Sequence, residues 1–160
     1  MRRSAGCPVG AIFRSSVVRR GLLGLVLAFA AIQLVPVSRS SPPVEAEVVA
    51  SANVRAVLRR ACYDCHSNET TWPWYSRVAP VSWLVARDVR EGRREVNFSD
   101  WSRYAPERQL KKLKECREQV GEGKMPPWFY VVAHREAALS AEDQALLREW
   151  TLGLAREPGK

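Results

Sequence analysis

The 160-residue sequence has few of the side chains that bind metals, with two His, two Met and four Cys. It has no internal repeats, no glycine-rich phosphate loop and no strand-like alternation of apolar and polar residues. These absences exclude a repeat architecture, a nucleotide-binding loop and a β-rich fold. The sequence therefore predicts an all-α protein in which each candidate ligand can be considered singly.

Acidic residues are missing from the first quarter of the chain. Six of the 25 Lys and Arg residues, and none of the 17 Asp and Glu residues, lie in residues 1–40. The formal net charge of +8 therefore falls to about +2 for the remainder. A nearly balanced charge on the folded part disfavours a nucleic-acid partner.

The N-terminal region resembles an export or anchoring segment. Residues 1–20 form an Arg-rich leader, and residues 21–37 are apolar apart from Gln33. This length lies between that of a signal-peptide core and that of a spanning helix. We expect a membrane anchor with its basic leader in the cytoplasm, the alternative being a cleaved signal peptide. Residues 38–50 then read as a tether, and 51–155 as the globular domain.

The motif with the most chemistry is C-x-x-C-H at residues 62–66. Cys62 and Cys65 can each form a thioether bond with a haem vinyl group, and His66 can ligate the iron. A zinc site would need Cys116 or His134 as a further ligand, without the usual second C-x-x-C pair. A thiol-redox motif would lie in a βαβ pattern, which is absent. The motif therefore predicts one covalent haem c.

Met125 is the candidate for the second iron ligand. It lies in a loop before two prolines, and the only other Met is Met1 in the leader. A thioether opposite a histidine is common in electron-transfer haems. The alternatives are His134, which would give two histidine ligands, and an open iron site.

Two tryptophans follow the motif closely. Trp72 and Trp74 flank a proline in the segment after His66. Such aromatic density suits an apolar wall against a porphyrin, although ordinary core packing explains it equally well. We expect at least one of the two to contact the haem.

Four helices are expected around these residues. Apolar residues at helical spacing, proline starts and a Ser140–Asp143 capping pair predict helices at about 51–61, 80–94, 106–120 and 140–152. Residues 122–139 are expected to be loop.

Residues 40–155 resemble the small haem-binding domain family of bacterial exported proteins. The resemblance is carried by ACYDCHSNETTWPWYSRVAPVSWLV at 61–85, NFSDW at 97–101, MPPW at 125–128 and the closing helix from Leu139. It implies a cytochrome c-like helical domain with thioethers at Cys62 and Cys65, His66 on the iron and Met125 as distal ligand. Cys7 and Cys116 are not part of the pattern and are assigned no role.

These features together predict an exported, membrane-attached c-type haem protein in the bacterial cell envelope, with its haem domain in the periplasm. The expected function is one-electron transfer between redox partner proteins with His/Met ligation. The alternative is a redox or gas sensor, or a peroxidase-like enzyme, with an open or displaceable distal site.

Overall fold

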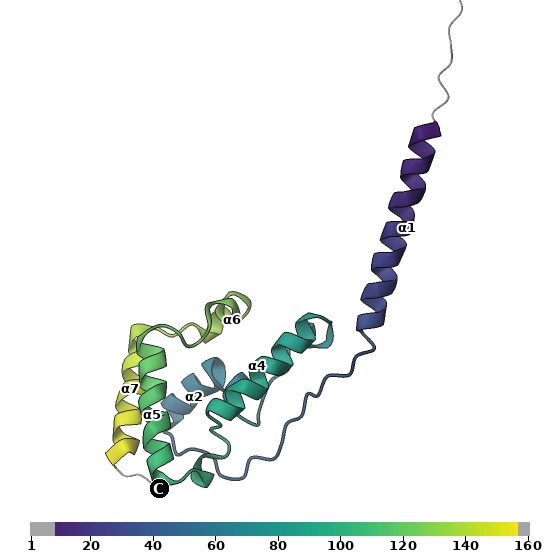
Figure 1. The fold of residues 1–160 in the computed structure, drawn as a ribbon. Coiled ribbons are helices and arrows are strands. Elements are labelled where there is room, and N and C mark those ends of the chain that lie inside the picture. Colours follow the sequence, from purple (N-terminus) through teal and green to yellow (C-terminus); the bar gives the residue numbers. More distant parts are fainter. Residues whose placement is uncertain (1–8, 157–160) are drawn as a thin grey trace, which may run out of the picture.

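The computed structural model describes residues 9–156 as seven α-helices and three short 3-10 helices, with no strand in that range (Figure 1). Residues 1–8, which include Cys7, and 157–160 lie outside the described residues. The all-α prediction is confirmed for this part. The elements are α1 (Val9–Ile32), α2 (Ala52–Ala61), α3 (Tyr63–His66), η1 (Trp74–Arg77), α4 (Val81–Glu95), η2 (Trp101–Arg103), α5 (Pro106–Gly121), α6 (Trp128–Ala133), η3 (Arg135–Ala137) and α7 (Ala141–Arg156).

Helix starts follow the capping residues in the sequence. Ser51 caps α2 by accepting from Val54 N, and Pro106 is the first residue of α5. Ser140 and Asp143 form the expected capping box, with Ser140 N donating to Asp143 Oδ2 at 2.9 Å and Asp143 N donating to Ser140 Oγ at 3.1 Å. Local chemistry therefore positions three of the four expected helices.

The region expected to be loop contains a helix. α6 begins immediately after Pro127, which occupies the N-cap position. A proline at the start of a helix loses no intrahelical hydrogen bond, so the two prolines exclude helix only up to that residue. The final helix also runs further than expected, to Arg156.

The core lies where α2, α3, α5 and α7 meet the segment around Phe98. Its buried members are Val48, Val54, Val57, Leu58, Tyr63, Val96, Phe98, Trp101, Leu113 and Leu147. α5 packs along α7, while α3 packs against α4 (Figure 1). The C-x-x-C-H turn is therefore held between two packed groups of helices.

Residues 38–50, expected to be a tether, pack along the domain. Val48 N donates to Phe98 O at 2.9 Å and Ala46 N donates to Ser99 O at 3.1 Å. Val48 is only 1% exposed and belongs to the core cluster. The end of this segment therefore contributes to the domain, because its backbone finds partners beside Phe98 and its valine finds an apolar site.

The apolar helix α1 projects from the domain (Figure 1). Its leucines are exposed. Among the helices that the structure describes, none has both the length and the hydropathy needed to cross a membrane. Just beyond α1, the Gln33 side chain donates to Ala79 O at 3.2 Å and accepts from Ala79 N at 2.9 Å. Arg39 donates to Ser76 O at 3.1 Å. The segment after α1 is thus bound to the loop before α4.

Candidate functional site

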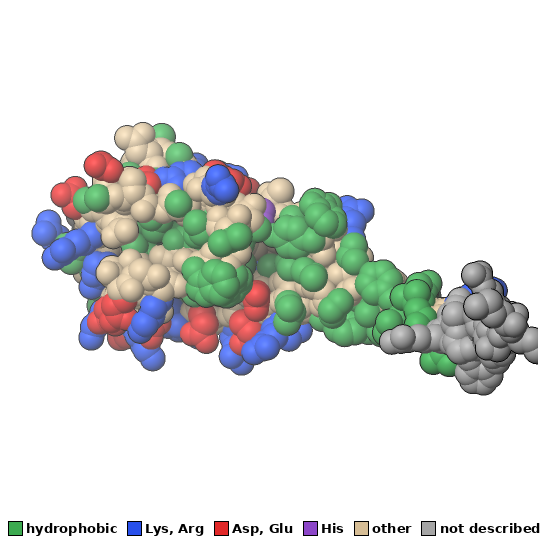
Figure 2. Space-filling view, turned by 90° about the horizontal axis from the view of Figure 1, so that it is seen from above, with side chains coloured by type: hydrophobic (Ala, Val, Ile, Leu, Met, Phe, Trp, Pro, Cys, Tyr) green, Lys and Arg blue, Asp and Glu red, His purple; other side chains and the backbone are tan. Residues whose placement is uncertain are grey.

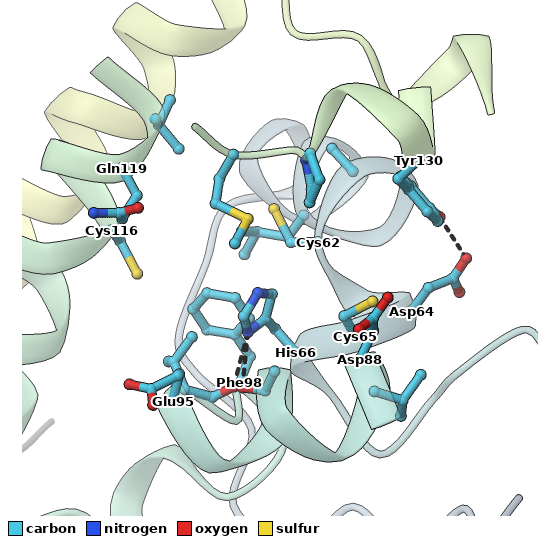
Figure 3. A pocket seen from close by; sticks show the side chains of 18 of the residues that line it. Cys62, Asp64, Cys65, His66, Asp88, Glu95, Phe98, Cys116, Gln119 and Tyr130 are labelled. Carbon is cyan, nitrogen blue, oxygen red and sulfur yellow. Dashed lines mark hydrogen bonds between the residues drawn. The ribbon is translucent and has the colours of Figure 1, made fainter. Parts of the chain in front are cut away.

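The C-x-x-C-H residues occupy a tight turn between two helices. Cys62 ends α2, with its N–H donating to Leu58 O at 2.8 Å, and its own carbonyl accepts from His66 N at 2.9 Å. The following turn, α3, brings Cys62, Cys65 and His66 to one wall of a cavity. Figure 3 shows these three side chains and, on another wall, Cys116 and Gln119 of α5.

The imidazole of His66 is oriented by backbone carbonyls. Its Nδ1 lies 2.9 Å from Gly92 O and 3.2 Å from Val96 O. Because carbonyl oxygens only accept hydrogen bonds, Nδ1 carries the proton and Nε2 keeps a lone pair. Burial lowers the pKa of His66, which favours the neutral ring. A neutral imidazole with one nitrogen fixed and the other available is the form that ligates iron.

Helix α4 approaches the motif so closely that only glycine fits at position 92. A Cβ on Gly92 would lie 2.5 Å from the carbonyl oxygen of Cys65 and 3.0 Å from its Cβ. This contact is what allows Gly92 O to reach His66 Nδ1. Sequence reasoning missed this role, since Gly92 lies among the charged residues of an ordinary helix.

The cavity beside the motif has a volume of about 1590 Å³. That is larger than the range of about 300–1,000 Å³ typical of small-molecule pockets. Its apolar wall includes Val81, Leu84 and Val85 of α4 and Phe129 of α6. Val81 and Leu84 are 41% and 56% exposed, because they face this cavity rather than a packed neighbour. A large, mostly apolar group would cover them.

The three thiols at the cavity are free and protonated. Burial raises the pKa of Cys62 and of Cys65 to about 12, and that of Cys116 to about 11. Reactive redox cysteines have the opposite property, a lowered pKa and accessible thiolate. This argues against the thiol-redox alternative. The structure also gives Cys116 a place on the cavity wall, which spacing alone did not reveal.

The zinc alternative finds no ligand set in the described part of the chain. Within residues 9–156, no group of three or more His, Cys, Asp or Glu side chains is arranged to hold a metal ion. His134, one of the two candidates for the further zinc ligand, does not line the cavity. The arrangement around Cys62 and Cys65 therefore does not have the closed set of ligands that a structural zinc requires.

The two candidates for second ligand lie in different places. Met125 lines the cavity, and its backbone N–H donates to Gln119 O at 3.1 Å. His134 lies outside the cavity lining, with its Nε2 2.6 Å from the Tyr75 hydroxyl and its Nδ1 3.3 Å from Glu136 Oε1. Met125 is therefore positioned to reach a group in the cavity, whereas both nitrogens of His134 are already engaged.

The segment that carries Trp72 and Trp74, of which at least one is predicted to contact the haem, reaches the cavity through its other residues. Neither Trp72 nor Trp74 lines the cavity, whereas the neighbouring Pro73 and Tyr75 do. Trp74 is 78% exposed, and the indole nitrogen of Trp72 is buried without a hydrogen-bond partner. The turn of η1 aims the tyrosine rather than Trp74 at the cavity.

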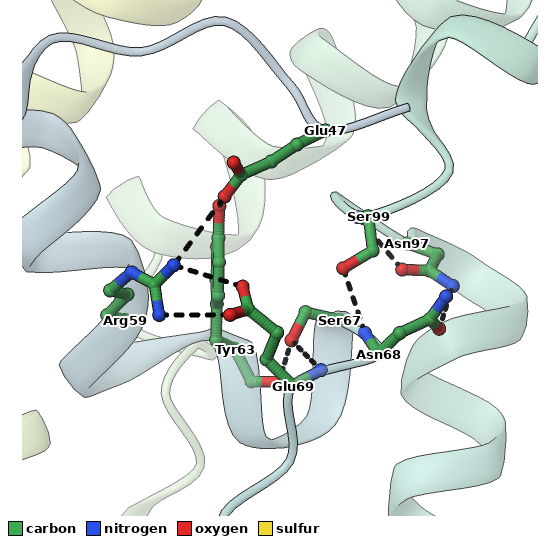
Figure 4. Close-up of polar contacts among 8 residues, drawn as sticks. All are labelled: Glu47, Arg59, Tyr63, Ser67, Asn68, Glu69, Asn97 and Ser99. Atoms are coloured by element: carbon green, nitrogen blue, oxygen red, sulfur yellow. Dashed lines mark hydrogen bonds and ion pairs between the residues drawn. The ribbon is translucent and has the colours of Figure 1, made fainter. Parts of the chain in front are cut away.

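Polar contacts lock the motif to its surroundings. Tyr130 of α6 donates to Asp64 Oδ2 at 2.6 Å (Figure 3). Burial and this hydrogen bond raise the pKa of Tyr130. On the far side of the turn, Tyr63 donates to Glu47 Oε1 at 2.9 Å (Figure 4). The motif is thus tied both to α6 and to the segment that precedes α2.

A buried network fixes the chain just after His66. Ser99 Oγ accepts from Asn68 N at 2.9 Å, and Asn97 donates to Asn68 Oδ1 at 2.8 Å (Figure 4). Phe98 N donates to His66 O at 2.8 Å. Because these groups are buried, each bond prevents the cost of an unsatisfied polar atom.

These features define a class of protein, an all-α domain with a large apolar cavity walled by a C-x-x-C-H turn. The donor set fits a haem, since two thiols and a neutral imidazole share one wall. The chain belongs to the haem-binding domain family, whose model matches residues 27–152. Comparison with curated proteins and with solved structures gives no match.

Proposed function

We propose that the protein is an exported one-electron carrier with a single covalently bound haem c. The observation that carries this proposal is the geometry of His66. Its Nδ1 is satisfied by Gly92 O, and its ring lies on the same cavity wall as Cys62 and Cys65. This is the arrangement that the attachment chemistry requires.

Covalent attachment needs only the two thiols and the vinyl groups of the haem. In each addition an S–C bond forms, the S–H bond and the vinyl π bond break, and the proton goes to the other vinyl carbon. No electrons leave the system, so no oxidant is required. Cys62 and Cys65 are free thiols, as this reaction demands.

The chain's contribution to electron transfer is to hold the iron on both sides and to exclude water. The haem supplies the one-electron couple. His66 is proposed as proximal ligand and Met125 as distal ligand, both being residues of the cavity wall. Asp64, the acid within the motif itself, already accepts from Tyr130 and from Thr71 N. Its engagement favours a carrier over an acid–base enzyme.

We also propose that the domain acts in the cell envelope and is attached to the membrane through residues 21–37, with redox proteins as its partners. Covalent haem attachment follows export in bacteria, which agrees with the basic leader. Figure 2 shows apolar side chains gathered on the part of the domain next to α1. Trp74, Val78, Val81 and Trp83 are exposed, and they lie in the stretch of chain around Ala79, whose backbone is bound by Gln33 just after α1. A surface of this kind favours a lipid or protein cover.

The test is intact mass and visible spectroscopy of the full chain expressed with haem-attachment machinery. We expect the mass to increase by one haem and the spectrum to be low-spin, with a thioether–iron charge-transfer band. Met125→Ala should abolish that band and lower the reduction potential, whereas the control His134→Ala should change neither. An unmodified mass would contradict covalent attachment, and an unchanged Met125→Ala spectrum would contradict the carrier as proposed.

A further inference from the structure

We propose that Arg117 binds a carboxylate of the haem, so that its guanidinium anchors one propionate in the cavity. Arg117 lies on α5 and lines the cavity. Its Nη1 is buried and has no hydrogen-bond partner. A buried guanidinium N–H without an acceptor is costly, and an anionic group in the cavity would satisfy it.

The other cations of the cavity wall do not share this property. Lys112 donates to Glu115 Oε2 at 3.0 Å and lies 3.7 Å from Glu95 Oε2. Arg148 is exposed to solvent. Arg117 is therefore the cavity cation that combines burial with a missing acceptor.

The acids next to Arg117 in the helix do not supply that acceptor. Glu115 is engaged by Lys112 and lies 3.7 Å from the ammonium of Lys111. Glu118 lies 3.7 Å from the ammonium of Lys114. The carboxylates next to Arg117 are thus paired with lysines of α5. The guanidinium of Arg117 is therefore able to pair with a carboxylate that the chain itself does not supply.

The chemistry of arginine suits this ligand. A guanidinium presents several N–H groups in a planar fork that matches a carboxylate, and such charge-assisted hydrogen bonds are about twice as strong as neutral ones. Cys116, the preceding residue, also lines the cavity, so this stretch of α5 faces the site (Figure 3). The inference rests on haem binding and does not require covalent attachment or electron transfer.

The experiment compares haemin with haemin dimethyl ester, in which both carboxylates are neutralised. The full chain carrying Cys62→Ser and Cys65→Ser is titrated with each probe, with binding followed by absorbance. Arg117→Gln is made in this background. Arg148→Gln is the matched control, since it removes the same charge from the same cavity wall.

We expect Arg117→Gln to weaken haemin binding about tenfold, which corresponds to about 1.4 kcal/mol, and to leave ester binding unchanged. Arg117→Lys should restore part of the affinity for haemin, and Arg148→Gln should affect both probes equally. An equal effect of Arg117→Gln on the two probes, or no effect on either, would overturn the proposal. So would failure of the parent chain to bind haemin. An unmodified mass in the attachment experiment, by contrast, would count only against the covalent carrier.

Discussion

Replacing Gly92 by alanine is expected to separate α4 from the C-x-x-C-H turn. The added Cβ would lie 2.5 Å from Cys65 O and 3.0 Å from the Cys65 carbonyl carbon. Backbone atoms cannot rotate out of the way, so the helix or the turn must move. Because Gly92 O accepts the hydrogen bond from His66 Nδ1, the movement also disturbs the imidazole.

The expected change in the free energy of unfolding is the difference between two opposing effects. Overpacking a tight contact costs about 1–3 kcal/mol, and a contact against backbone belongs at the upper end. Alanine is better than glycine within a helix by about 1 kcal/mol. We therefore expect Gly92→Ala to lower the free energy of unfolding by about 2 kcal/mol, or the Tm by roughly 8 °C.

The assay is urea denaturation of the haem-free full chain followed by circular dichroism. Gly153→Ala is the matched control, since it lies within α7 and its added Cβ meets nothing within 4 Å. That variant should be stabilised by up to about 1 kcal/mol. Expression with the attachment machinery should give a smaller haem-loaded fraction for Gly92→Ala than for Gly153→Ala. Equal stability of the two variants would refute the close-contact argument.

Three further outcomes can be checked in the same denaturation assay. Tyr130→Phe removes the donor to Asp64 and should lower the free energy of unfolding by about 1–2 kcal/mol. Hydrogen exchange in α6 should become faster, and unchanged exchange would contradict a stabilising role for this hydrogen bond. Ser99→Ala leaves the buried N–H of Asn68 without its acceptor and should cost about 1–3 kcal/mol, whereas a neutral result would mean that the network is dispensable. The hydrogen bond that Arg60 of α2 donates to the Asp143 carboxylate lowers the pKa of Asp143. The stability it contributes is therefore present above about pH 4 and lost as the pH falls through the lowered value. Asp143→Asn should show a smaller loss on acidification, and an identical pH profile would refute this.

Several parts of the fold were predictable because their causes are local. The Ser51 cap, the Pro106 start and the Ser140–Asp143 box each depend on residues within one helical turn. Helix α6 was not predicted, because Pro126 and Pro127 predict a loop for the whole region. A proline is nevertheless compatible with the start of a helix, and Pro127 is the N-cap of α6. The packing of Val48 was not predictable either, since its partner Phe98 lies far along the chain.

By itself the sequence determined the haem motif, because Cys62, Cys65 and His66 lie within five consecutive residues. It also limited the candidates for a second iron ligand, since Met125 and His134 are the only Met and His beyond Met1 and His66. The tertiary structure separates these two positions, since Met125 lines the cavity and His134 does not. It alone revealed Gly92 and Arg117, because a close approach between helices and a buried unpartnered atom exist only once distant segments pack together.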